Sequence, residues 1–586
     1  MTQARPNVLA LTVDALRADR MSLYGYERPT SPSMEKLGAD SIVCDNALTM
    51  APFTQAACIQ LFTSSRPLSY GGYDAGARGR PITLFEHFKN AGYSTWGLST
   101  IHWVSPYYGY TGGLEQEHGV FHLNTMVGMA VVNMRDTLYY YRAGSMETDE
   151  MLTRVTPVIE RMFDNIHAYS DVMRHSLRDY KLDFPAAKIS HDCYNFNAVQ
   201  AVVVKHRSLF RKDPLAYIST QLTNLTRAPD AHEWIAGDWY YRREPIKLVC
   251  EFLFRASNKA LRFFNPAQAD KRAASVRLAV DAHAIANKVI SALRNYDPSK
   301  PFFIWAHFKD THRPFVSGPG LKWYDHTPDY LAALGYPRAL DPTFSFREHY
   351  AKNEEERETL SALYDAAVLS TDEAIGRIIT EVKNLGLYDE TVIGMCGDHG
   401  EEIGEHGDYG HECMAYEHNS RVPMVFKPAG NASATGHTDT LITSLDFAPT
   451  LSSLADIDPA SGWAGANVNS SAAQSRDHIV TETFCRGNCL FDLRPLYMGV
   501  RTKQHKYLWC EGIDPHHKRG TPEPRLYDLS IDRLEQNNIY RADHPLVTEF
   551  NQFIANRLNE VPEISSSRIK ALLSGEADSS IKEKAS

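Results

Sequence analysis

The chain has 586 residues and a formal net charge of −10, with 43% hydrophobic and 23% charged residues. These values predict a globular protein of two domains, or of one large domain with insertions. The acidic balance argues against a nucleic-acid partner. The nine cysteines are odd in number, scattered and without Cys-x-x-Cys spacing, which predicts reduced thiols rather than a disulfide framework.

The beginning of the chain is polar over residues 1–6, and a buried-strand pattern starts at Asn7. No stretch reaches the roughly 18 apolar residues that a membrane-spanning helix needs. We therefore expect a cytoplasmic protein that is at most peripheral to a membrane. Asp14 follows the first predicted strand, residues 7–13, where ligands bind in an open α/β sheet. Asp14 could equally be a helix N-cap.

The sequence APFTQAAC, residues 51–58, leads into a stretch that looks helical. Thr54 would lie at or near the helix N-terminus, where the partly positive helix end favours an alkoxide or a bound anion. The simpler alternative is that Thr54 only caps the helix. His102 follows a short predicted strand at 95–98 and could face the same site, although an isolated histidine is often structural.

Residues 125–295 have a different character. Apolar residues recur at helical spacing between 151 and 163, which predicts amphipathic helices. Nine basic residues and only three acids lie between 242 and 277, and a second basic group lies at 205–212. Such a region could attract an anionic substrate or a lipid surface, and it could equally be the solvated face of a helical insertion.

Two later strands also end in polar side chains. The strand predicted at 301–308 is followed by KDTHRP, which contains His312. The strand predicted at 391–396 follows a helix at 360–385 and leads into GDHGEEIGEHGDYGH, residues 397–411. Imidazole and carboxylate groups on a glycine-rich loop are the donors that a divalent metal needs. A polar surface loop is the alternative.

The C-terminal part contains a helix predicted at 441–454, and strands at 478–483, 497–501 and 505–509. A helix is expected at 546–558, and a mobile polar tail from 565.

Four stretches, in this order, resemble the sulfatase family of the alkaline-phosphatase superfamily. They are PNVLALTVDALRADRMSLYGYERPTSPSMEKL, PFFIWAHFKDTHRPF, LYDETVIGMCGDHGEEIGEHGDYGH followed by Arg421-Val422-Pro423, and RLYDLSIDRLEQNN. The resemblance implies an α/β fold with a mixed, mostly parallel sheet sandwiched by helices. It further implies a division into a catalytic core, a helical insertion, a small C-terminal antiparallel subdomain and a tail, at residues 1–124 with 296–460, 125–295, 461–564 and 565–586.

The nucleophile position departs from the family's pattern. Classical sulfatases carry Cys-x-Pro/Ala-x-Arg, in which the cysteine is oxidised to formylglycine. Here Thr54 stands in place of that cysteine and Cys58 in place of the arginine. Formylglycine chemistry is therefore not expected. A threonine at this position is similar to phosphoethanolamine and glycerol-phosphate transferases of the superfamily, in which a metal-bound threonine takes up the phosphoryl group.

The resemblance implies that Asp14, Asp398, His399 and the Thr54 hydroxyl hold one divalent metal ion. One imidazole among oxygen ligands favours zinc or manganese, with calcium or magnesium also possible. Thr54 would be the nucleophile, and His312 would protonate the leaving oxygen.

Three further residues are expected to bind the anionic substrate group. His411 and His102 lie close to positions where relatives contact that group. Arg17 is either a phosphate clamp or a salt-bridged scaffold residue. His406 is undecided between a site role and loop packing.

The main functional prediction is a metal-dependent hydrolase or transferase that acts on a phosphate ester through Thr54. One alternative is a sulfuric ester hydrolase that works without formylglycine, because sulfuryl and phosphoryl groups are both tetrahedral anions. The other is a catalytically degenerate binding protein that contacts membranes through the basic helical insertion.

Overall fold

The computed structural model describes residues 5–110, 112–119, 123–183, 196–222, 281–313, 315, 354–411, 413–430, 435–485, 487–512 and 523–574, with a few positions between 253 and 265. The basic residues at 242–277 that the sequence singled out lie outside the described residues. Within the described ranges, no helix is long and apolar enough to cross a membrane.

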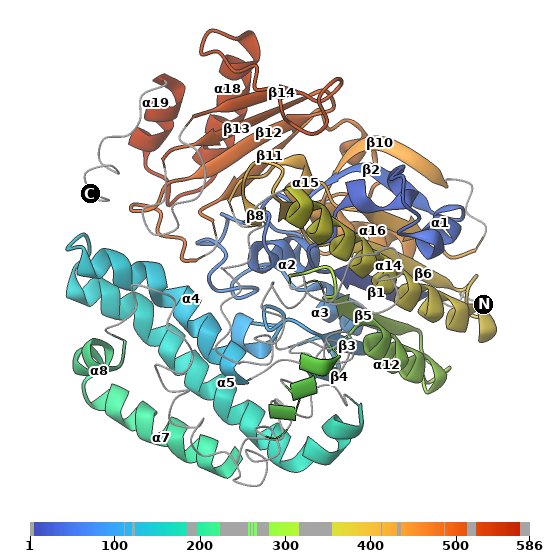
Figure 1. The fold of residues 1–586 in the computed structure, drawn as a ribbon, viewed down its shortest axis with the longest axis horizontal. Helices are drawn as coiled ribbons and strands as arrows, with labels where there is room; N and C mark the ends of the chain where they lie inside the picture. Colours follow the sequence, from blue (N-terminus) through green and yellow to red (C-terminus); the bar gives the residue numbers. More distant parts are fainter. Residues whose placement is uncertain are drawn as a thin grey trace.

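An eight-stranded sheet forms the centre of the molecule (Figure 1). Its strand order is β10-β2-β9-β6-β1-β5-β3-β4. The bounds are β1 (Asn7–Val13), β2 (Ile42–Leu48), β3 (Ser94–Ser99), β4 (Gln116–Gly119), β5 (Phe302–Phe308), β6 (Thr391–Gly397), β9 (Met424–Lys427) and β10 (Gly436–Thr443). All neighbours pair in parallel except β9, which is antiparallel to both β2 and β6.

Helices cover both faces of this sheet. Val8 and Ala10 of β1 pack in one core with Phe62 and Phe85, from α2 (Thr54–Thr63) and α3 (Leu84–Asn90). The alternate residues of β1, such as Leu9, point into the second core. That core includes side chains of α1 (Pro32–Gly38), α12 (Ala282–Arg294) and α14 (Glu354–Asn384). Burial on both faces explains why β1, β5 and β6 read as continuous apolar runs.

The C-terminal part forms a separate four-stranded antiparallel sheet, which Figure 1 draws in orange to red. Its strands are β11 (His478–Thr483), β12 (Tyr497–Thr502), β13 (His505–Cys510) and β14 (Arg525–Asp528), and the helices α18 (Pro545–Asn559) and α19 (Ser566–Ser574) pack on it. The expected mobile tail is wrong for α19, because Ile569 and Leu572 are buried in the core of this sheet.

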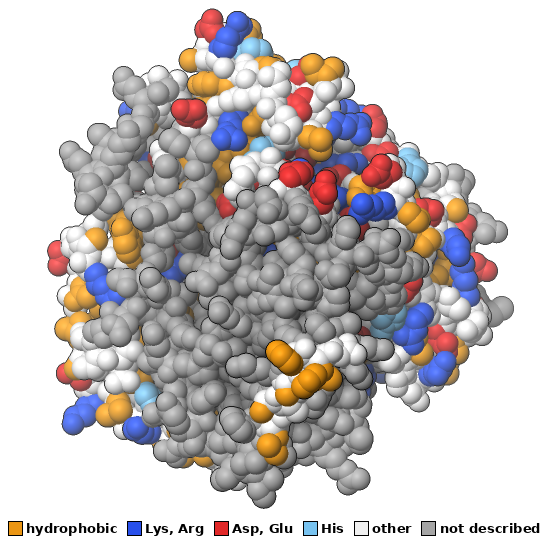
Figure 2. Space-filling view, viewed as in Figure 1, with side chains coloured by type: hydrophobic (Ala, Val, Ile, Leu, Met, Phe, Trp, Pro, Cys, Tyr) orange, Lys and Arg blue, Asp and Glu red, His pale blue; other side chains and the backbone are white. Residues whose placement is uncertain are grey.

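Four helices of the 125–295 region lie together on one side of the molecule (Figure 1). They are α4 (Leu123–Arg142), α5 (Thr148–Asp183), α7 (Phe196–Lys212) and α8 (Pro214–Gln221). Their apolar faces join the core that includes α2 and α3. In the predicted basic group at 205–212, Arg207 and Arg211 both pair with Glu160 of α5. Figure 2 shows Lys and Arg side chains next to Asp and Glu at the upper right of its face.

The remaining elements are short. They are β7 (Glu402–Ile403), β8 (Tyr409–Gly410), α15 (Glu417–Ser420), α16 (Phe447–Leu454), α17 (Ser471–Gln474) and the 3-10 turns at Ala18–Arg20, Ser22–Tyr24, Pro106–Tyr108 and Ser444–Asp446.

One secondary-structure prediction is wrong. The helix expected at 441–454 begins only at Phe447, because 436–443 form the edge strand β10, which pairs in parallel with β2. The predicted fold class is confirmed: a mixed, mostly parallel sheet between helices, with a C-terminal antiparallel subdomain.

Candidate active site

The register of three central strands brings their C-terminal ends to one edge. Val13 of β1 lies opposite Phe308 of β5 and opposite Gly397 of β6. The residues that follow these strands, Asp14, Lys309 and Asp398, therefore emerge side by side. Ligands bind at such an edge in open α/β sheets.

Thr54 meets this edge from the first turn of α2. Its Oγ1 lies 3.0 Å from Nε2 of His399 and 3.5 Å from Oδ1 of Asp14. Phe53, and not Thr54, occupies the N-cap position, so the interpretation of Thr54 as a cap is wrong. The hydroxyl instead points to the strand ends, at the partly positive end of a ten-residue buried helix.

The tautomer of His399 is set by its surroundings. Its Nδ1 lies 2.8 Å from the Gly400 carbonyl oxygen, which can only accept, so Nδ1 carries the proton. Burial lowers the pKa of His399, which keeps the ring neutral. Nε2 therefore presents a lone pair, 3.5 Å from Asp14 Oδ1 and 3.5 Å from Asp398 Oδ2. The hydrogen bond to a carbonyl is typical of metal-binding histidines.

In each of the two aspartates, one carboxylate oxygen accepts no hydrogen bond. Oδ1 of Asp398 accepts hydrogen bonds from the amides of Ala15 at 3.0 Å and His399 at 2.7 Å. Oδ2 of Asp398 and Oδ2 of Asp14 are buried without a hydrogen-bond partner. Burial and the nearby Asp14 charge raise the pKa of Asp398. Two such carboxylates are costly to bury without a compensating cation.

Asp14, Asp398 and His399 fit a divalent metal ion. One donor atom from each lies within 4.8 Å of the others, and all three residues are buried. A cation at this point would take up the two orphaned oxygens and the Nε2 lone pair. Two carboxylates and one imidazole suit several divalent ions. The three predicted ligands and the Thr54 hydroxyl are thus brought together.

His411 returns to the same place from the end of the loop. Its ring centroid lies 4.1 Å from that of His399 and 5.2 Å from that of His312. Its Nδ1 lies 3.5 Å from Glu401 Oε1, and Arg313 contacts the same carboxylate at 3.4 Å. This position is compatible with the predicted contact to the substrate anion, which stays a prediction.

His312 lies at the site in the neutral state. Its Nδ1 donates to the carbonyl oxygen of Arg313 at 2.7 Å, and burial lowers its pKa to about 3. Nε2 therefore carries no proton at neutral pH. The predicted role as general acid stays a prediction, and it requires the negative charge of a bound substrate to raise this pKa.

Arg17 has the contacts of a scaffold residue. Its buried guanidinium pairs with Asp19 at 2.7 Å and Glu405 at 2.5 Å, and it donates to the Glu401 carbonyl oxygen at 3.0 Å. These contacts join the loop after β1 to the loop after β6. The phosphate-clamp interpretation finds no support, because carboxylates already occupy the guanidinium.

His102 is buried after β3, with its ring centroid 5.0 Å from that of Trp103 and 6.3 Å from that of Tyr108. Its predicted contact with the substrate stays a prediction.

Sequence reasoning missed His307 and Lys309. His307 Nε2 lies 4.0 Å and Lys309 Nζ 3.9 Å from Oδ2 of Asp14. Trp305 Nε1 donates to Thr12 Oγ1 at 3.0 Å, and that hydroxyl lies 2.8 Å from His307 Nδ1. Because the hydroxyl proton can then point to Nδ1, the other nitrogen, which faces Asp14, carries the ring proton. The sequence feature that could have identified both residues is the polar run at the end of the strand motif PFFIWAHFKDTHR.

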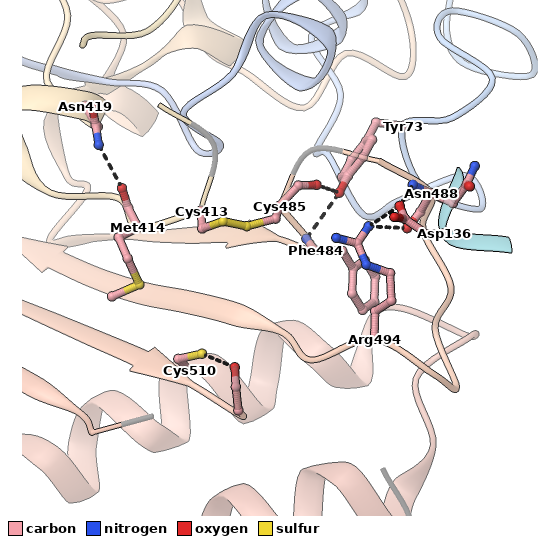
Figure 3. The surroundings of a disulfide bond; sticks show 11 residues. Tyr73, Asp136, Cys413, Met414, Asn419, Phe484, Cys485, Asn488, Arg494 and Cys510 are labelled. Atoms are coloured by element: carbon pink, nitrogen blue, oxygen red, sulfur yellow. Dashed lines mark hydrogen bonds and ion pairs between the residues drawn. A yellow bond between two sulfur atoms is a disulfide. The ribbon is translucent and has the colours of Figure 1, made fainter. Parts of the chain in front are cut away.

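A disulfide joins the loop that follows His411 to the C-terminal sheet (Figure 3). Cys413 bonds to Cys485, which follows β11, so the prediction that all cysteines are reduced thiols is wrong for this pair. Tyr73 donates from its hydroxyl to the Cys485 carbonyl oxygen at 2.5 Å and accepts from the Phe484 amide at 3.2 Å. The spacing within the sequence, 72 residues, gave no hint of this pairing.

The comparisons with known proteins agree with this geometry. The family model described as Sulfatase matches residues 6–169 and 232–457, and the model described as N-sulphoglucosamine sulphohydrolase, C-terminal, matches residues 404–563. Arylsulfatase K of Rattus norvegicus is 26% identical over 314 residues, which cover 48% of this chain and 53% of that protein. The match thus spans about half the length of that relative.

Two further likenesses extend over nearly the whole chain. An arylsulfatase of Clostridium perfringens is 20% identical over 561 residues, covering 92% of this chain and 91% of the relative. The crystal structure of the phosphonate monoester hydrolase of Agrobacterium radiobacter shares the fold, with a TM-score of 0.51 and 16% identity over 99% of this chain and 97% of the other. The Sulfatase model covers more than half of the sequence and includes every strand end that builds the site. The chain belongs to the sulfatase family.

Proposed function

We propose that this chain hydrolyses a sulfate ester, with the Thr54 hydroxyl as its nucleophile. Family membership and the names of the relatives favour a sulfate ester over the phosphate ester that the sequence first suggested. The observation that carries the proposal is the position of Thr54 Oγ1, 3.0 Å from His399 Nε2 and beside two carboxylates with uncommitted oxygens.

In the proposed reaction, Thr54 Oγ1 forms a bond to sulfur while the bond between sulfur and the leaving oxygen breaks. A divalent ion held by Asp14, Asp398 and His399 would lower the pKa of the hydroxyl. Asp14 Oδ1 lies 3.5 Å from the hydroxyl as an acceptor for its proton. Water then attacks sulfur, releases sulfate and restores Thr54.

The surrounding side chains would stabilise and protonate the reacting group. The Lys309 ammonium, 3.9 Å from Asp14 Oδ2, would provide a positive charge beside the transferred anion. His312 would protonate the leaving oxygen once the bound anion has raised its pKa, and His411 would contact the sulfuryl oxygens. The single imidazole among the ligands supports zinc or manganese as the metal.

A phosphate ester is the second candidate substrate, with hydrolysis or transfer to an acceptor alcohol as the outcome. The residue at position 54 favours it: an unmodified threonine forms an ordinary ester with the transferred group, and phosphate esters of hydroxyl side chains are common covalent intermediates.

A catalytically degenerate binding protein is the third candidate. This candidate would contact membranes through the 125–295 region. The pairing of Arg207 and Arg211 with Glu160 speaks against such contact, because it supports a solvated helical face.

One substrate panel tests these candidates. Aryl sulfates, aryl phosphate monoesters and aryl phosphate diesters would be assayed with added zinc, manganese, calcium or magnesium. The matched control is Thr54→Ser, which keeps a hydroxyl, against Thr54→Ala, which removes it. Faster turnover of the sulfate supports the proposal, and faster turnover of a phosphate overturns it in favour of the second candidate. If the wild type and Thr54→Ala both turn over every ester at the background rate, the sulfate and the phosphate proposals are both overturned.

A further inference from the structure

A second cluster of metal-binding side chains lies in and beside the same loop. Glu402 belongs to β7, His406 lies in the turn between β7 and β8, and His418 belongs to α15. One donor atom from each lies within 4.8 Å of the others. We propose that Glu402, His406 and His418 bind a second divalent cation, zinc by preference, at a site that ties the catalytic loop to the C-terminal subdomain.

The spacing of the donors is that of ligands around a metal rather than of hydrogen-bonded groups. His406 Nδ1 lies 3.8 Å from Glu402 Oε1, and His418 Nε2 lies 3.6 Å from Glu402 Oε2. Both distances exceed those of protein hydrogen bonds. Ligand atoms on a tetrahedral zinc with bonds of about 2.0–2.1 Å are separated by roughly 3.3–3.4 Å. The two distances run to different oxygens of Glu402, and the three donors lie within 4.8 Å of one another, so the cluster would contract when it closes on an ion.

The two imidazole nitrogens that face Glu402 are otherwise uncommitted. Nδ1 of His406 and Nε2 of His418 are buried without a hydrogen-bond partner. His418 and Glu402 are 6% and 5% exposed. A buried polar atom without a hydrogen-bond partner destabilises the folded state. A bound cation would remove that destabilisation for both rings.

The orientation of His406 is fixed from its other side. Its Nε2 lies 3.0 Å from the backbone carbonyl oxygen of Glu535, which accepts the ring proton and leaves Nδ1 with a lone pair. Its ring stacks on Tyr416 at 3.8 Å with an interplanar angle of 6°, and on His418 at 5.1 Å. A histidine whose second nitrogen donates to a carbonyl is the usual arrangement of a metal ligand.

The donor set selects the ion and its role. Two imidazoles and one carboxylate are zinc ligands, whereas calcium and magnesium prefer oxygen donors alone. The site is separate from Asp14, Asp398 and His399 in its ligands, and its burial points to attachment rather than to catalysis. Glu535 follows β14, so an ion here would connect β7, α15 and the C-terminal subdomain.

The alternative is an ion pair without metal, in which protonated histidines neutralise Glu402. Metal counting on the full chain decides between the two. Wild type, His418→Gln, Asp398→Asn and the double variant would be stripped with a chelator, reloaded with zinc, freed of excess and analysed by mass spectrometry. His437→Gln is the matched control, since His437 is exposed and pairs with Asp45.

We expect His418→Gln to hold one zinc fewer per chain than the wild type and His437→Gln, and the loss to add to that of Asp398→Asn. Equal zinc content in His418→Gln and the wild type overturns the proposal. If His418→Gln does not fold, X-ray absorption of zinc in the Asp14→Asn, Asp398→Asn variant replaces it. A spectrum that shows two imidazole ligands per zinc then supports the site. A spectrum that shows one imidazole or none overturns the proposal, and so does the absence of bound zinc.

Discussion

The two clusters of the 397–411 loop differ in what holds them. Asp14, Asp398 and His399 follow parallel strands in the centre of the sheet, and Thr54 begins a fully buried helix. Glu402, His406 and His418 sit on a two-residue strand, a turn and a one-turn helix. The first cluster takes its geometry from a rigid scaffold that would position a reacting group, whereas the second is held by side-chain and loop contacts such as those of His406 with Tyr416 and Glu535. If both proposals hold, the loop would take part in chemistry at its beginning and in attachment at its middle.

The largest effect is expected from Thr54→Ala, which acts on the first cluster alone. Removal of the proposed nucleophile should lower kcat/KM by about 10⁴-fold or more. Zinc binding at the second cluster and the unfolding midpoint should stay near those of the wild type. The measurement is turnover of the preferred ester together with a urea titration. Retention of more than a tenth of the wild-type activity would remove Thr54 from the mechanism.

The Arg17→Met substitution should remove the ion pair with Glu405 that joins the loop after β1 to the loop after β6. The guanidinium is 1% exposed between Asp19 and Glu405, so its loss removes the shorter ion pair of the half-buried Glu405 and leaves only Arg20, at 3.7 Å. The free energy of unfolding should fall by about 3–5 kcal/mol in urea titrations. Arg154→Ala is the control: it breaks an exposed pair with Glu150 within one helix, and it should cost less than about 1 kcal/mol. Equal effects of the two changes would contradict the scaffold role of Arg17.

Lys309→Met tests whether the charge beside Asp14 serves the reaction. We expect kcat/KM to fall by about 10²-fold with little change in stability, since the side chain is 30% exposed. Lys309→Arg keeps the charge and should retain most of the activity. A methionine variant as active as the wild type would show that the ammonium is not used.

Acid pH gives the smallest expected effect. Burial would raise the pKa of Glu405, but the Arg17 guanidinium holds it well below its usual range. A lowered folded-state pKa means that the pair stabilises the fold above about pH 4.3, the usual value for glutamate, and that this stability is lost as the pH falls below it. Urea titrations between pH 3 and 7 should show that decline in the wild type. In the Arg17→Met variant, the decline in stability at acid pH should be flattened or reversed. Parallel curves for the two proteins would contradict the assignment of this decline to the Arg17–Glu405 pair.

The central strands and the main site could be predicted because their signals are local. The runs that form β1, β5 and β6 are mostly apolar and buried along their whole length, and a polar residue follows each of them at the sheet edge. Strand β10 was missed because its exposed half reads as a polar loop before the apolar residues of the following helix. The Cys413–Cys485 bond and the contact of His406 with Glu535 join residues far apart in the chain, which a single sequence does not encode locally.

The disulfide has a consequence for how the chain responds to a protease. Cys413 and Cys485 enclose β9, β10, α16 and β11 in one covalent ring. A single cut anywhere inside that ring would leave the catalytic part and the C-terminal sheet joined, and the mass of the chain would change only by the water added. Two fragments would separate on a denaturing gel only after a reducing agent is added.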